Sequence, residues 1–150
     1  NNDMWRIWGL VCFQDKDYFV DLTNKRFKQE KIELFLSTKG IALYDTACAI
    51  VRTKNTASDK DLEVVENTDI EELLQQIPHC EAIVTTGQKA TDILTEHFHI
   101  AQPAVGDYTP FHYSDKDMRL YRMPSSSRAY PLSIVKKAEK YKILLNIINN

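Results

Sequence analysis

The stretch Leu120–Lys142, LYRMPSSSRAYPLSIVKKAEKYK, decides the fold that we expect for this chain. An alternating apolar run ends at Met123, a loop of small residues follows, and a long amphipathic helix begins at Pro131. A strand that leads through a short loop into a helix presents unpaired backbone N–H groups and the positive end of the helix dipole. The stretch therefore predicts a strand-loop-helix unit whose serine loop, residues 124–128, suits phosphate.

Positive charge is concentrated around the serine loop. Residues 116–142 hold eight Lys or Arg against two acids, which gives this segment +6, although the whole chain carries −2. We therefore expect the face around the loop to meet a polyanion such as nucleic acid. The basic residues are Lys116, Arg119, Arg122, Arg128, Lys136, Lys137, Lys140 and Lys142. Lys136 and Lys137 are expected to reach neighbouring phosphates.

A second strand-loop-helix unit lies upstream of the first. Ala82–Thr86 is a short β-branched run, Gly87 follows it, and Gln88–Phe98 has apolar residues at helical spacing. Two such units indicate parallel strands covered by helices, hence the α/β class with a small, mainly parallel central sheet. Ligands of such sheets gather at the carboxyl ends of the strands, where Gly87 and the serine loop lie.

The rest of the chain predicts further elements. Glycine favours the left-handed conformation that ends a helix, so Gly40 is expected to terminate one. The expected elements are helices over Met4–Leu10 and Asn24–Ser37, a strand turning into a short helix over Ile41–Val51, a loop over Arg52–Lys60, a helix from Asp69 to Ile77 ended by Pro78, an irregular loop over residues 101–117, a strand over Met118–Met123 and a helix over Pro131–Ile148.

The composition is that of one globular domain. A chain of 150 residues can bury a core without disulfides, and 43% apolar and 27% charged residues are ordinary values. No stretch approaches the ~20 apolar residues of a membrane span, and no signal peptide is visible. The three cysteines are widely spaced in apolar surroundings without the pairs typical of metal sites. We expect a cytoplasmic monomer with reduced cysteines, no metal and no membrane partner.

Four segments resemble the uracil-DNA glycosylase superfamily. They are Asn2-Asp3-Met4-Trp5, similar to an N-x-[Phe/Met]-Trp element; Gly40-Ile41 with Tyr44-Asp45, Arg52 and Ser58-Asp59; Ile83–Ala90 (IVTTGQKA), similar to a strand-Gly-x-x-Ala unit; and Met123–Ala129, similar to a Leu-Pro-Ser-x-Ser-x-Ala loop. The closest branch is the hypoxanthine and mismatch-specific glycosylases. The resemblance implies a three-layer α/β/α fold and a DNA repair enzyme that flips out and excises uracil or hypoxanthine.

The resemblance also implies roles for individual residues. Asn2 and Asp45 are the implied catalytic residues, and Trp5 is implied to stack on the flipped base. The implied DNA contacts are Gly87, Ser125, Ser126, Ser127 and Arg128. The partner is then DNA, duplex or single-stranded, in the nucleoid if the source is bacterial, and no cofactor is needed. The bond between sugar and base breaks through an oxocarbenium-like state, which oriented dipoles and a placed water stabilise without a metal.

Each of these residues also has an ordinary structural interpretation. Asn2 is equally well explained as a surface residue, and Trp5 as a core residue. Asp45 is equally well explained as a cap for a buried backbone group. Gly87 suits tight strand-helix packing, and the serine loop alone is typical of a capped turn. Asp59 is an alternative acid, or part of a turn. An amide such as Asn2 orients a water but is too weak a base to take its proton.

Two other functions stay open, and one expected motif is missing. A catalytically silent module could use the same loop to bind nucleic acid or a nucleotide phosphate. A small-molecule enzyme with a phosphate at Gly87 is disfavoured, because neither GxGxxG nor GxxxxGK[ST] occurs. The family's first strand and its G-[S/T]-x-P-G turn would lie upstream of Asn2, so we expect residues 1–150 to form one domain of a longer chain.

Overall fold

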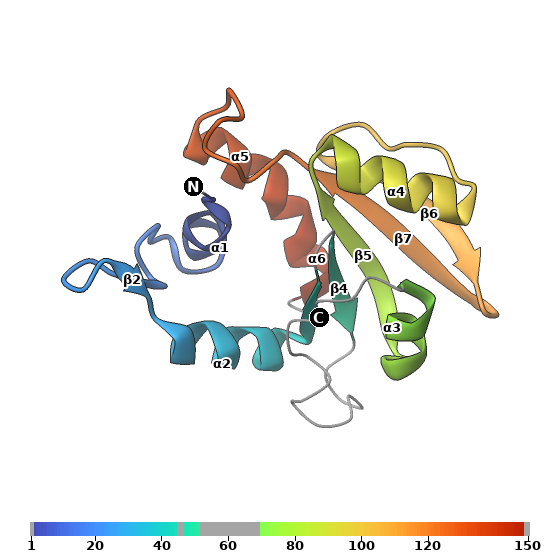
Figure 1. Ribbon diagram of the computed structural model, residues 1–150, viewed down its shortest axis with the longest axis horizontal. Helices are drawn as coiled ribbons and strands as arrows, with labels where there is room; N and C mark the ends of the chain where they lie inside the picture. Colours follow the sequence, from blue (N-terminus) through green and yellow to red (C-terminus); the bar gives the residue numbers. More distant parts are fainter. Residues whose placement is uncertain (1, 45–46, 52–69, 149–150) are drawn as a thin grey trace.

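The computed structural model describes residues 2–44, 47–51 and 70–148. Helices are interspersed with single strands and pairs of strands along this part of the chain (Figure 1). In order they are α1 (Met4–Phe13), β1 (Val20–Asp21), β2 (Arg26–Phe27), α2 (Gln29–Lys39), β3 (Ile41–Tyr44), β4 (Ala47–Val51), α3 (Ile70–Gln76), β5 (Cys80–Thr86), α4 (Gln88–Phe98), β6 (Asp107–Tyr113), β7 (Lys116–Met123), α5 (Ile134–Tyr141), the short 3₁₀ helix η3 (Lys142–Leu144) and α6 (Leu145–Ile148). The protein is of the α/β class.

The main sheet has the strand order β3-β4-β5-β7-β6. The two strands of the predicted strand-loop-helix units, β5 and β7, are adjacent and parallel, as expected. The other described pairs in this sheet are antiparallel, so the prediction of a mainly parallel sheet was wrong. Two of these pairs, β3–β4 and β6–β7, join strands that directly follow each other in the chain, and such hairpin partners run antiparallel. The pair β4–β5 is also antiparallel, although α3 separates its strands in the chain. Strands β1 and β2 form a separate two-stranded ribbon.

Helices cover both faces of the sheet (Figure 1). On one face α1, α2 and α5 pack against the alternate residues Val84, Tyr121 and Met123 of β5 and β7. On the other face α3 and α4 pack against Ile83 and Leu120. Because side chains of a strand alternate between faces, β5 and β7 are buried on both sides, as is usual for parallel strands. The sheet thus lies between two helical layers.

The pattern at the second unit was predicted correctly. Helix α4 has the predicted bounds, and β5 begins two residues before the predicted Ala82. Helix α1 runs three residues beyond the predicted Leu10, to Phe13. Gly40 ends α2 with φ of 67°, in the left-handed conformation that was expected there. Apolar residues at helical spacing, with a glycine at a helix end, were sufficient to predict these elements.

The predicted irregular loop at 101–117 was wrong. Residues 107–113 form the edge strand β6, which pairs with β7 through a tight turn at Ser114 and Asp115, both with positive φ. Pro110 obscured the strand, because proline lacks the N–H that a central strand needs. An edge strand tolerates it. The alternation of the aromatic Phe111 and Tyr113 with the polar His112 and Ser114 was the available signal.

Three other boundaries need correction. Residues Asn24–Lys28 were assigned to a helix, but they hold the β1–β2 turn and β2, and α2 begins only at Gln29. Ile41–Val51 contains the strands β3 and β4 and not a strand followed by a helix. The helix predicted over Pro131–Ile148 begins only at Ile134, where the Ser133 side chain caps α5 by accepting the Lys136 N–H at 3.2 Å, and it is divided into α5, η3 and α6. Arg52–Lys60 and Asp69 lie outside the described residues.

Two of the cysteines are described as free thiols. Cys80 is buried, and Cys12, a residue of α1, is half-buried against the core. Burial raises the pKa of the Cys12 thiol to about 11, although nearby Lys39 acts in the opposite direction, so the thiol stays protonated at neutral pH. In the described part of the chain no helix is long and apolar enough to cross a membrane.

Candidate nucleic-acid interface

The carboxyl ends of the two parallel strands are joined by backbone contacts. The Gly87 N–H, after β5, donates to the Met123 carbonyl at the end of β7 (3.3 Å). A Cβ built on Gly87 would lie 3.8 Å from the Ser125 Cβ, so Gly87 packs directly against the serine loop. Thr91 holds the turn from inside α4, because its hydroxyl donates to the Gly87 carbonyl at 2.7 Å. Gly87 and Ser125, two of the predicted DNA contacts, are thus neighbours in space.

Replacing Gly87 by alanine should destabilise the protein more than the same change at Gly40. Gly87 has φ of 108° and ψ of 169°, a region that only glycine adopts readily, and we expect a loss of about 3 kcal/mol. Gly40 is in the ordinary left-handed region, where alanine costs about 1 kcal/mol. Urea unfolding measures both. Equal losses, or no loss at Gly87, would contradict this account of the turn.

The serine loop is organised by its own hydroxyl groups. The Ser125 hydroxyl accepts the Ser127 N–H at 3.2 Å, and the Ser127 hydroxyl accepts the Ala129 N–H at 3.2 Å. Ser126 is only 3% exposed. Ser125 and Ser127 are half-buried, and each hydroxyl keeps a proton to donate. Their position suits a phosphate contact, whereas Ser126 is placed as an internal residue.

Asn2 lies beside the serine loop, although 125 positions separate the two in the chain. Asn2 and Ser127 form an isolated antiparallel β-bridge, and the Asp3 N–H donates to the Ser126 carbonyl at 2.8 Å. The Asn2 side chain is exposed, and its Oδ1 accepts the Met4 N–H at 2.8 Å, at the start of α1. The structure thus brings together the amide and the loop that the sequence singled out separately.

Arg128 is tied to the same junction. Its Nε donates to the Asp3 Oδ1 at 2.9 Å, which anchors the guanidinium while the side chain stays 52% exposed. The partner carboxylate is 14% exposed. A guanidinium carries five N–H donors, so one bond to Asp3 leaves others for a phosphate.

Lys137 supports the serine loop from beneath and is not the surface contact that was predicted. Its side chain is 1% exposed, and its Nζ donates to the Ser127 carbonyl at 2.8 Å. The ammonium also lies 5.8 Å from the centre of the Tyr130 ring. No ion pair with a carboxylate is found for it among the described residues. Lys136, by contrast, is exposed.

A hollow of about 380 Å³, here called the basic hollow, opens next to Asn2 and Arg128. The β1–β2 ribbon and α1 form its other walls, and the ribbon projects from the left of the molecule in Figure 1. One amide side chain, four cationic side chains and three apolar side chains line this hollow. The lining residues are Asn2, Arg6, Val20, Leu22, Lys25, Arg26, Phe27 and Arg128.

The spatial clustering of charge differs from its clustering in the sequence. Lys116 and the Ser125 region lie at opposite ends of β7, roughly 23 Å apart at the rise of a strand. Arg122 binds the Gln88 side chain and the Pro103 carbonyl, so its role is structural. The prediction that the whole basic segment surrounds the loop was therefore wrong. Sequence reasoning missed the cations that do gather there: Arg6, Lys25 and Arg26.

The other predicted site residues are placed less informatively. Trp5 is half-buried, and its ring packs edge-on against Phe19 with centroids 5.5 Å apart, so it is part of the core boundary. Trp5 is not among the residues that line the basic hollow. Asp45 and Asp59 lie outside the described residues. Among the residues that are described, no group of three metal-binding side chains occurs.

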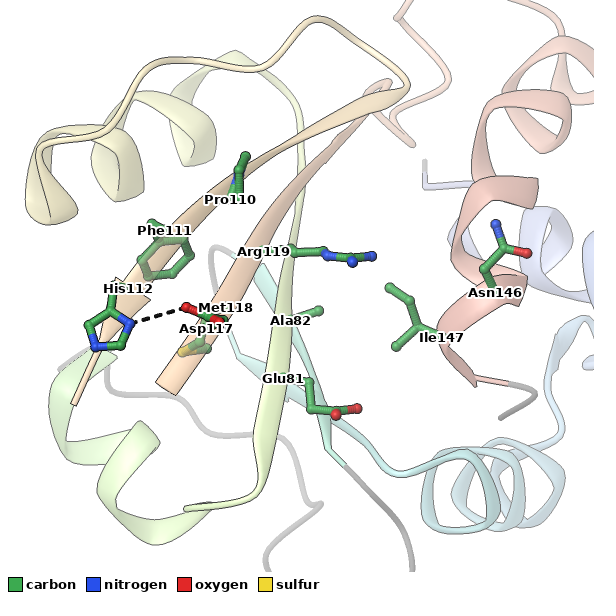
Figure 2. Close-up of a pocket in the computed structure, with 10 residues that line it drawn as sticks. All are labelled: Glu81, Ala82, Pro110, Phe111, His112, Asp117, Met118, Arg119, Asn146 and Ile147. Carbon is green, nitrogen blue, oxygen red and sulfur yellow. Dashed lines mark hydrogen bonds and ion pairs between the residues drawn. The ribbon is translucent and has the colours of Figure 1, made fainter. Parts of the chain in front are cut away.

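A larger hollow of about 730 Å³ lies elsewhere, between the sheet and α6 (Figure 2). Arg119 extends into it, toward Asn146 and Ile147. The Arg119 pKa is raised by its hydrogen bond to the Tyr121 hydroxyl and by Tyr108, whose ring it covers at 4.9 Å. This hollow borders the amino ends of β5 and β7, whereas α/β sheets bind ligands at the carboxyl ends. The basic hollow is therefore the better candidate.

Comparison of the chain with family models, with curated proteins and with solved structures finds no match.

Proposed function

We propose that the protein is a DNA glycosylase of the uracil-DNA glycosylase type, which flips out and excises a deaminated or mismatched base such as uracil or hypoxanthine. The observation that carries this proposal is the bridge between Asn2 and Ser127. It places an exposed amide next to a loop that suits a DNA backbone, at the carboxyl ends of the parallel strands. The layered α/β architecture is compatible with that type of fold.

The proposed chemistry assigns a separate task to each part of the site. Ser125, Ser127 and Arg128 hold the backbone of the damaged strand, so that the nucleotide between the held phosphates can rotate outward. Asn2 then orients a water and hydrogen-bonds the edge of the extruded base. Flipping costs a few kcal/mol for a weak pair, which the backbone contacts offset. The products are a free base and an abasic site.

Release of free base tests this proposal directly. Purified protein should release uracil or hypoxanthine from oligonucleotides that contain one such base, and the strand should then break at the abasic site under alkali. An otherwise identical oligonucleotide with only ordinary bases is the control. Absence of release from both damaged substrates, in single-stranded and duplex form and at low and moderate salt, would overturn the proposal.

A catalytically silent DNA-binding module is the second candidate, and one contact favours it. The Asn2 Oδ1 already accepts the N–H of Met4, the first residue of α1, so the acceptor that would position a water is engaged. A carboxylate that could take a proton is also occupied nearby, since Asp3 is bonded to Arg128. In this case DNA binding should persist without base release, and the Asn2 side chain should be dispensable for binding.

A further inference from the structure

The β1–β2 ribbon, with its turn residues 22–25, faces Asn2 and Arg128 across the basic hollow. We propose that this ribbon is a second nucleic-acid contact, which binds single-stranded DNA by holding its phosphates at Lys25 and Arg26 and stacking an unpaired base on Phe27. This deepens the proposed function, because it names the strand form bound at the same site. The residues by which it is tested, Lys25, Arg26 and Phe27, are not among those that carry the proposed chemistry.

The cations of the ribbon are presented outward. The Arg26 side chain is 74% exposed, and its Nε lies 3.9 Å from the Asp21 carboxylate, at the outer limit of an ion pair. Lys25 adopts a positive φ of 54° at the turn, and no ion pair is found for it in the described ranges. Arg6 faces the hollow from α1. With Arg128 opposite, cations from three separate segments border one hollow, as expected for a path along a polyanion.

The acids near these cations have other tasks. Asp21 accepts both the backbone N–H and the side-chain amide of Asn24, and these bonds lower the pKa of its carboxyl group. It therefore holds the β1–β2 turn and orients Arg26. Asp3 joins Arg128 to α1 and is mostly covered. Asp17 lies 3.9 Å from Arg6, a weak contact. Arg26 and Arg128 are more exposed than the carboxylates they contact, whereas Arg6 is slightly less exposed than Asp17, so Arg26 and Arg128 are the cations that an approaching strand meets first.

Apolar side chains between the cations favour an unpaired strand over a duplex. Phe27 is 41% exposed and Leu22 is 65% exposed, and both line the hollow. Bases that are already unstacked can place their flat faces on an aromatic ring, whereas bases inside a duplex cannot. Cations that follow the backbone beside an aromatic platform are the usual composition of single-strand binding sites. The cations and the exposed aromatic ring thus both favour single-stranded DNA.

The test measures binding of a labelled single-stranded oligonucleotide with ordinary bases, by fluorescence anisotropy over a range of salt. Phe27→Ala should weaken binding about tenfold, and Phe27→Tyr, which keeps the ring, should bind like the unmodified protein. Arg26→Gln and Lys25→Gln should each lower the slope of log K against log salt by about 0.7. A matched duplex should compete poorly for the same site.

Two variants serve as controls, and the outcomes separate the two proposals. Leu34→Ala removes an even more exposed apolar residue on α2, and Lys142→Gln removes a charge from η3, so both variants should bind normally. Unchanged binding in the Phe27 and Arg26 variants, or equal competition by duplex, would overturn this inference even if base release is observed. The predicted losses without any base release would support the ribbon contact and reject the glycosylase.

Discussion

Replacing Asn2 by alanine should reduce the rate of base release roughly a hundredfold, while the affinity for damaged DNA changes less than twofold. The expected size is that of removing one well-placed polar group from a site where charge develops. Affinity should persist, because the proposed backbone contacts come from Ser125, Ser127 and Arg128. Single-turnover base release and anisotropy under the same conditions measure the two quantities.

Asn2→Ala also removes the contact with the Met4 N–H, so a control for lost capping is needed. Ser133→Ala provides it, because the Ser133 hydroxyl likewise accepts a backbone N–H from the first turn of a helix, that of Lys136 in α5. Each change should lower the free energy of unfolding by about 1 kcal/mol. Only the Asn2 change should slow base release. Comparable loss in the Ser133 variant, or near-normal release in the Asn2 variant, would remove Asn2 from the proposed chemistry.

Replacing Lys137 by methionine should weaken DNA binding about tenfold, with little change in stability. The substitution removes a buried positive charge that contacts the serine loop through the Ser127 carbonyl. Two effects on stability oppose each other. The carbonyl loses a charge-assisted hydrogen bond, and the cost of burying an ammonium group disappears, so the net change should stay within about 1 kcal/mol. Binding should fall because the loop loses both its support and the field beneath it.

Lys136→Met is the matched control for this prediction. Lys136 is the preceding residue of the same helix and carries the same charge, but it is exposed. Its removal should weaken binding no more than about threefold, as expected for a screened surface charge. Thermal unfolding and salt-dependent binding should be measured for both variants. If both bind equally well, the buried ammonium does not contribute to the interface.

The fold was predictable wherever a local pattern decides the structure. The period of apolar residues at Gln88–Phe98, with Gly87 before it, determined α4 and its place after β5. Strand β6 was not predictable in this way, because Pro110 is acceptable only at a sheet edge, and whether a strand lies at an edge depends on its partners. The antiparallel pairing of β3, β4 and β5 likewise depends on contacts between segments and not on the composition of any one of them.

The candidate site divides along the same line. Residues 124–128 could be selected from their small side chains before a helix, and the family resemblance added Asn2. The cations Arg6, Lys25 and Arg26 could not be selected, because each has an ordinary surface pattern around it and they meet only through the packing of α1 against the β1–β2 ribbon. Conversely, the density of charge along the chain wrongly placed Lys116 and Arg122 in the site, because residues close in sequence are spread along the full length of an extended strand.

The contacts of Asn2 and Asp3 with residues 126–128 have a consequence for biosynthesis. Because these contacts span about 125 positions, a nascent chain that ends before the serine loop lacks this junction, whichever helices have already formed. Closing so long a loop is entropically unfavourable and tends to come late in folding. On the proposed function, the complete binding face should therefore form late in folding, once residues 126–128 have joined Asn2 and Asp3.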